Sequence, residues 1–159
     1  MSGAGGARAT CDSESQVKSV VELDIETPLP RVAALFGNPG NSTKWMHDID
    51  RYEPLSGQPG TPGSKYRLVP KKGSMVFVAT VLPGASPNEF RLELSASNVT
   101  VSIAATLTAL PNGWTHLMST EVFSFTSLIQ RIFGVLATPA IRKAHRRHME
   151  AFKQFAEER

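Results

Sequence analysis

The sequence contains a single cysteine, Cys11, and no apolar run of the roughly 18 residues that a membrane-spanning helix requires. One cysteine cannot form an internal disulfide, so we expect a reducing compartment, most simply the cytoplasm. The first residues, MSGAGGARATCDSESQ, lack both the apolar centre of a secretory signal and any apolar periodicity. We therefore expect residues 1–16 to form a flexible tail and residues 17–159 to form one domain.

Charged residues make up 19% of the chain, an ordinary share for a globular protein, and the excess of one sign of charge is small. The chain has 17 Lys and Arg against 14 Asp and Glu, which gives a net charge of +3. From Ile141 onward there are six Lys or Arg and three Glu, so the excess lies in the last segment. Such a segment is typical of a solvated helix face, and no nucleic-acid-binding motif accompanies it. We expect no nucleic-acid partner.

Several catalytic signatures are missing as well. Ser124 and Ser127 lack the flanking glycines of a nucleophile elbow, and no glycine-rich loop could cradle a phosphate. The motif HRRH places His145 and His148 three residues apart, a spacing that can ligate a metal. A third ligand would have to come from a distant Glu121, Asp48 or His116. We expect neither a metal nor a cofactor.

The segments that are present alternate between strand and helix patterns. Residues 17–26, VKSVVELDIE, place Val21, Leu23 and Ile25 on one side, as in a half-buried strand. A short helix follows, with Thr27 as the expected N-cap and Gly37 at its end. The segment NPGNSTKWM predicts a second short helix.

From about residue 49 the pattern is that of antiparallel strands, about six of them, separated by Gly, Pro and Asn-Gly turns. A helical pattern then begins near Leu128 and is interrupted at Pro139. This order predicts the α+β class: a curved antiparallel sheet of about seven strands wrapped around a long C-terminal helix. A sheet of this kind rarely closes tightly along a helix, so we expect a cavity between them.

Three side chains are unusual for the positions that they occupy. His145 and His148 fall on the apolar stripe of the last helix, with Ile141 and Phe152. Strand alternation places Glu121 on the inner side, where burial would raise the pKa of its carboxyl group. Of the neighbours Tyr66 and Arg67, only one can face inward.

The segment Leu128–Leu136 carries more large apolar residues than one buried helix face can hold. Three interpretations are open: a segment packed over the cavity, a mobile lid, or a surface that makes transient contact with a membrane or partner.

The stretches GNPGNSTKWMHDIDRYEPLSG, GSKYRL and RIFGVLATPAIRKAHRRHMEAFKQFAEE resemble the polyketide cyclase/dehydrase and lipid-transport group. That group belongs to the START-like, or SRPBCC, helix-grip superfamily, and the resemblance extends from Val17 to Glu158. It implies binding of a small hydrophobic molecule, such as a lipid, polyketide or isoprenoid, in a deep apolar cavity. The residues expected at the ligand are Trp45, Tyr66, Phe77, Ile103, Glu121, Phe133, Ile141, His145 and His148.

The same resemblance implies an alternative, a cyclase or dehydratase that uses acid and base groups in the pocket. Its candidate catalytic residues are Glu121, His145 and Arg67. Such an enzyme requires Glu121 and one of the two histidines to converge within hydrogen-bond reach in one pocket.

Overall fold

The computed structural model describes residues 16–73 and 75–158, so residues 1–15 of the predicted tail, which include Cys11, lie outside the described residues. The elements, in chain order, are β1 (Gln16–Ile25), α1 (Leu29–Phe36), the 3-10 helix η1 (Pro39–Asn41), α2 (Ser42–Trp45), β2 (Ile49–Ser56), β3 (Lys65–Pro70), β4 (Phe77–Leu82), β5 (Glu89–Ala96), β6 (Val99–Ala109), β7 (Thr115–Phe125), α3 (Leu128–Leu136) and α4 (Thr138–Glu157). The first strand therefore begins at Gln16, one residue before the expected boundary.

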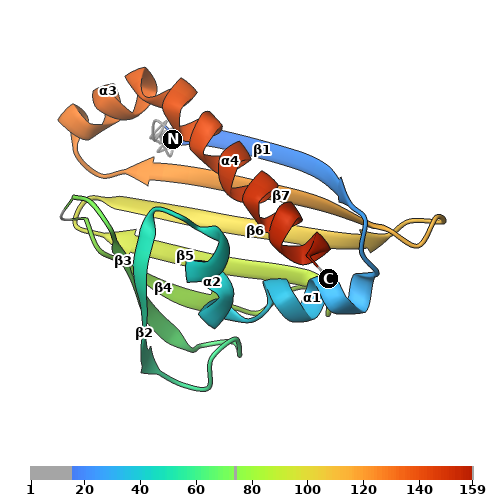
Figure 1. Cartoon of the computed structure of the whole chain (residues 1–159). Coiled ribbons are helices and arrows are strands. Elements are labelled where there is room, and N and C mark those ends of the chain that lie inside the picture. Colours follow the sequence, from blue (N-terminus) through green and yellow to red (C-terminus); the bar gives the residue numbers. More distant parts are fainter. Residues whose placement is uncertain (1–15, 74, 159) are drawn as a thin grey trace, which may run out of the picture.

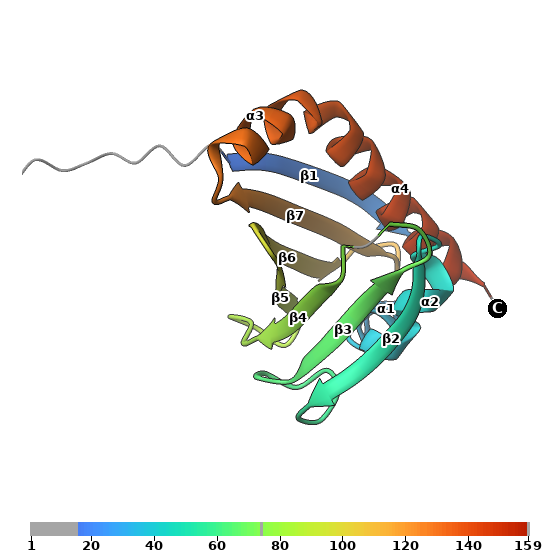
Figure 2. The same ribbon diagram turned by 90° about the vertical axis from the view of Figure 1, so that its left-hand side faces the viewer.

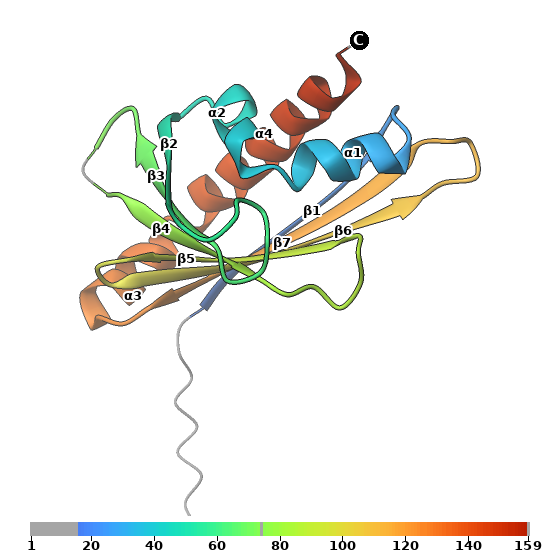
Figure 3. The same cartoon turned by 90° about the horizontal axis from the view of Figure 1, so that it is seen from below.

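The seven strands form one antiparallel sheet in the order β1-β7-β6-β5-β4-β3-β2. The sheet curves strongly, and α4 packs along β1 on the same side as α1 and α2 (Figures 1, 2 and 3). The predicted α+β class and the helix-grip arrangement are confirmed.

The start of α1 differs from the expectation. Its N-cap is Pro28, and Thr27 is instead buried between two distant elements. The Thr27 hydroxyl donates to the carbonyl oxygen of Ala156 at 3.1 Å, and the Thr27 carbonyl accepts from the hydroxyl of Thr115 at 2.7 Å. Thr27 thus joins the end of α4 to the sheet, and α1 ends at Gly37 as expected.

The predicted interruption of the last helix is present as a break at Ala137, between α3 and α4. Pro139 lies in the first turn of α4, where its missing N–H costs no helical hydrogen bond. The break lets the two helices take different directions over the sheet (Figure 2).

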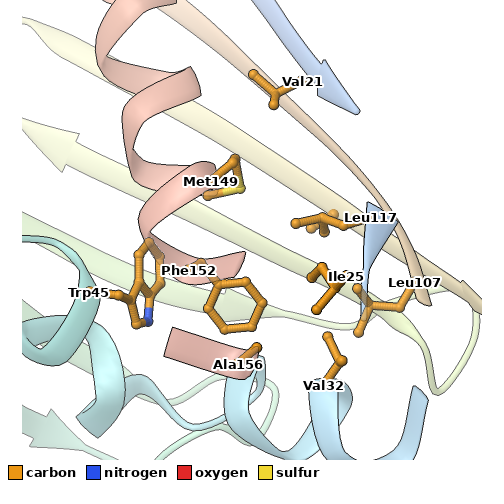
Figure 4. Packing of buried hydrophobic residues seen from close by; sticks show 10 residues of the cluster. Val21, Ile25, Val32, Trp45, Leu107, Leu117, Met149, Phe152 and Ala156 are labelled. Atoms are coloured by element: carbon orange, nitrogen blue, oxygen red, sulfur yellow. The ribbon is translucent and has the colours of Figure 1, made fainter. Parts of the chain in front are cut away.

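Two groups of buried apolar residues lie under the helices. The larger surrounds Phe152, with Trp45, Leu117 and Met149 among its members (Figure 4). The smaller contains Ile49, Tyr66, Leu68 and Ala79. The alternation of side chains along each strand determines which residues enter the core. Leu117 is fully buried, whereas its neighbour Met118 is exposed on the outer face of the sheet.

Candidate functional site: a cavity between the sheet and α4

A cavity of about 340 Å³ lies on the inner side of the sheet and is lined by residues of both buried groups. One row of its wall crosses four strands. Val81 of β4 pairs with Leu92 of β5, Leu92 with Ile103 of β6, and Ile103 with Glu121 of β7. Residues paired across antiparallel strands point to the same side, so all four side chains of this row face the cavity.

Aromatic side chains form one end of the cavity. Phe36, Trp45 and Phe90 all line it, and the ring of Phe36 lies 5.3 Å from that of Phe90, centroid to centroid. Phe152 of α4 supports this end from behind, 4.8 Å from Phe36 and 5.4 Å from Trp45. Edge-to-face contacts of this kind hold the rings in fixed orientations, so this wall is preformed.

Glu121 lies at the β7 end of this row. Its side chain is only 14% exposed, and burial raises the pKa of its carboxyl group to about 7. Desolvation disfavours the charged carboxylate, which explains the direction of the shift. Near neutral pH the carboxyl is therefore partly protonated and can both donate and accept a hydrogen bond.

His145 is buried between β1 and β7, and two serine hydroxyls hold its ring. Nδ1 lies 2.9 Å from Oγ of Ser19, and Nε2 lies 2.9 Å from Oγ of Ser119. Burial, with the nearby His148 and Arg146, lowers the pKa of His145 to about 4. The imidazole is therefore neutral near pH 7, so one ring nitrogen donates to a serine while the other accepts from the second serine.

His148 lies at the boundary between the cavity and the surface. Its Nε2 lies 2.8 Å from Oδ1 of Asp48, and it borders both the main cavity and a second hollow that includes His47 and Arg147. The two imidazoles of the HRRH motif thus have different environments: one is bonded within the core and the other reaches the cavity wall.

Five of the residues expected at the ligand line the cavity: Trp45, Tyr66, Ile103, Glu121 and His148. Tyr66 faces inward and its ring lies 5.0 Å from that of Tyr52, while burial raises the pKa of the Tyr66 hydroxyl.

Five other expectations are corrected. Arg67 lies on the outer side of β3, where its Nη1 is 2.9 Å from the Glu53 carboxylate, because its neighbour Tyr66 takes the inward position. Phe133 is exposed on α3, and Phe77 and Ile141 are half-buried beyond the cavity lining. His145 is also outside the lining, because Ser19 and Ser119 engage its ring.

The sequence interpretation missed several wall residues. Phe90, Leu92 and Leu94 of β5 line the cavity, and their strict alternation was a usable indication. Ser119 also lines it, but a single serine in a strand carries no comparable indication. Among residues 16–73 and 75–158, no three His, Cys, Asp or Glu side chains gather in an arrangement that could hold a metal ion. Within the same residues, no helix is both long and apolar enough to cross a bilayer.

These features define a helix-grip α+β protein with a mainly apolar cavity. No family model matches the chain, and no curated protein sequence is similar to it. Among solved structures 287 chains resemble it, so the fold is common and does not select a function by itself. One is a protein from Nitrosospira multiformis, a target of the Northeast structural genomics consortium, with a TM-score of 0.67 and 12% identity over 86% of this chain and 94% of that chain. At this identity the likeness shows the fold alone.

Proposed function

We propose that the protein is a START-like binder or carrier of a small, largely apolar molecule that bears one hydroxyl or carbonyl group. The observation that carries the proposal is the cavity itself: a mainly apolar wall that contains the buried carboxyl group of Glu121. Its volume of about 340 Å³ is within the range of roughly 300–1,000 Å³ typical of small-molecule sites. Lipid, polyketide and isoprenoid fragments fit this chemistry.

The polarity of the ligand head follows from the state of Glu121. A partly protonated carboxyl in an apolar wall is matched by a neutral group that accepts or donates one hydrogen bond. A ligand carboxylate would place a second negative charge beside Glu121 in a poorly solvated site, which costs free energy. We therefore favour alcohols and ketones over fatty acids.

The geometry supports binding better than cyclase or dehydratase catalysis. Oε1 of Glu121 lies 3.8 Å from Nε2 of His145, beyond hydrogen-bond distance, and both ring nitrogens of His145 already contact serine hydroxyls. A base that accepts a proton from a substrate needs a free nitrogen within reach of it. Glu121 therefore supplies an acid without a free basic partner at His145.

A cavity-filling variant tests the proposal. Ile103→Trp places an indole in the middle of the wall, whereas the control Ser102→Trp places one on the exposed outer face of the same strand. Binding of a neutral fluorescent probe, phenylnaphthylamine, should weaken at least tenfold in Ile103→Trp, a loss of about 1.4 kcal/mol, and should not change in Ser102→Trp.

Solvent extraction of the purified proteins, followed by mass spectrometry, identifies the natural ligand. We expect a neutral apolar molecule from the unmodified protein and from Ser102→Trp but not from Ile103→Trp. Equal probe binding by both variants, together with equal extracts, would show that the cavity is not the binding site.

A further inference from the structure

The helix α3 is amphipathic, but its apolar side faces away from the protein. Six large apolar residues are between 57% and 72% exposed: Leu128, Ile129, Ile132, Phe133, Val135 and Leu136. At about 100° per residue they occupy one arc of about 160° on the helix. A helix that serves only the fold buries such a stripe. This helix presents it to the surroundings.

The side of α3 that touches the protein is the small and polar one. Gly134 is buried against Phe125, so closely that a Cβ atom there would lie 2.4 Å from the Phe125 ring. Gln130 turns inward as well, and its Oε1 is buried without a hydrogen-bond partner. Arg131 Nε donates to the carbonyl oxygen of Phe125 at 3.2 Å. The helix is thus fixed to β7 by its polar side, and its apolar side is left for another contact.

Positive charge lies next to this apolar patch along the chain. The chain has no Asp or Glu between residues 122 and 149, but it has five Arg and Lys there. Arg131 belongs to α3, and Arg142, Lys143, Arg146 and Arg147 are exposed on the first turns of α4. In Figure 2 α3 and these turns of α4 form one continuous edge of the molecule.

We propose that α3 docks on an anionic lipid surface. The six apolar side chains would enter the boundary between headgroups and acyl chains, while the cations of α4 contact the anionic headgroups. A short helix with an exposed apolar stripe and a basic flank has the two features that interfacial binding requires. The inference rests on the outer surface of α3 and is independent of the cavity.

Charge also argues against a second copy of the chain as the occupant. A twofold dimer brings the same patch of both subunits together. Here it would place two sets of cations near each other, with no acidic residue from residues 122–149 to neutralise them. An anionic surface removes this repulsion and adds attraction.

Vesicle co-sedimentation tests the proposal. The full chain is mixed with vesicles of phosphatidylcholine alone and with vesicles of equal parts phosphatidylcholine and phosphatidylserine. We expect sedimentation with the second set, at least tenfold stronger than with the first, and weaker binding as salt is raised. Replacing Leu128 and Leu136 with Gln should abolish it, because both side chains are 72% exposed and contribute directly to the patch.

A matched control replaces two exposed apolar residues elsewhere, Leu55→Gln with Met118→Gln, and should bind as the unmodified chain does. A second pair of variants tests the contribution of charge separately from that of the apolar side chains. Lys143→Gln with Arg147→Gln should reduce binding several-fold, whereas Arg51→Gln with Lys65→Gln should not, because these two exposed cations lie on β2 and β3, at the opposite edge of the sheet from β1. Thermal unfolding of each variant verifies that it is folded.

Equal sedimentation of the α3 variant and its control would overturn the proposal, as would equal binding to both vesicle compositions. A dimer in size-exclusion chromatography with light scattering, lost in Leu128→Gln with Leu136→Gln, would assign the patch to a second copy instead. None of these results affects probe binding in the cavity, so the two proposals fail separately.

Discussion

The helices α3 and α4 are consecutive, meet at Ala137 and both have apolar and polar sides, yet they face the sheet in opposite ways. α4 buries His145, Met149, Phe152 and Ala156 and exposes most of its charged residues. α3 buries Gly134 and exposes its apolar stripe. Helical periodicity identifies the residues that share a side, but the medium that this side contacts depends on the surfaces that the fold offers.

The local cause of the difference is the neighbour that each helix meets. α4 crosses the concave side of the sheet, where an apolar surface is available to Phe152 and Met149. α3 meets the end of β7, where the Phe125 ring leaves room only for a residue without a side chain. Gly134 provides that position, and it sets the rotation of the whole helix.

The largest expected effect comes from truncating the buried apolar side of α4. Phe152→Ala should lower the free energy of unfolding by about 3–5 kcal/mol, because Phe152 is fully buried among Phe36, Trp45 and Met149. Leu136→Ala removes a side chain of similar chemistry from α3 and should change it by less than about 0.5 kcal/mol. Denaturant titration measures both values.

Similar losses of unfolding free energy in the two variants would contradict the difference between α3 and α4, because they would mean that the apolar stripe of α3 is packed against the protein in solution. A loss below about 1 kcal/mol for Phe152→Ala would instead contradict the burial of α4.

Most of the fold could be predicted from the sequence, because alternation and helical spacing depend on local geometry. The inward position of Glu121 followed from its sharing a side with Leu117 and Phe123. The serine contacts of His145 could not be predicted, because they depend on the pairing of β1 with β7. Ser19 lies 126 residues from His145 along the chain. A single sequence does not specify which strands pair.

The same limit applies to Arg67 and Tyr66. Alternation required that only one of them face inward, but choosing between them needed the register of β3 against β2, which places Arg67 opposite Glu53. The orientation of α3 depended on a single contact, between Gly134 and Phe125, that no periodicity reveals.

The second prediction concerns the polar residue on the buried side of α4. From the apolar stripe alone, Leu would suit position 145. The structure reverses this expectation, because His145→Leu leaves the buried hydroxyls of Ser19 and Ser119 without their partner. We expect His145→Leu to lower the free energy of unfolding by about 2 kcal/mol, measured by thermal or chemical unfolding.

Adding Ser19→Ala and Ser119→Ala should recover most of this free energy, because both hydroxyls are then absent. Failure of the triple variant to recover would mean that the imidazole acts through packing.

The triple variant also changes the dependence on pH. The pKa of His145 is about 4 in the folded chain, against an ordinary value of 6.5. As the pH falls from 6.5 to 4, the unfolded chain therefore binds a proton that the folded chain does not, and the stability of the fold decreases. The pKa of Glu121 is about 7 against an ordinary 4.5, so the folded chain keeps its proton and stability rises as pH falls from 7. These trends oppose each other in the unmodified chain. Without His145, stability should rise more steeply between pH 7 and 4.5, and an unchanged slope would contradict this assignment.

Gly134→Ala should have a smaller effect than Phe152→Ala or His145→Leu, and it tests what fixes the rotation of α3. The new Cβ would lie 2.4 to 2.9 Å from three atoms of the Phe125 ring, so the ring or the helix must move. Alanine also favours a helix over glycine by about 1 kcal/mol, which offsets part of the cost. We expect a net loss of about 1 kcal/mol in the free energy of unfolding. We also expect hydrogen exchange to be faster at the α3 amides than at the α4 amides.

In a Phe125→Ala background the ring is absent, so the same substitution should instead stabilise the protein by up to about 1 kcal/mol. The sign of the effect should therefore reverse between the two backgrounds. An equal cost in both would mean that Phe125 does not hold α3, and that the apolar stripe faces outward for another reason.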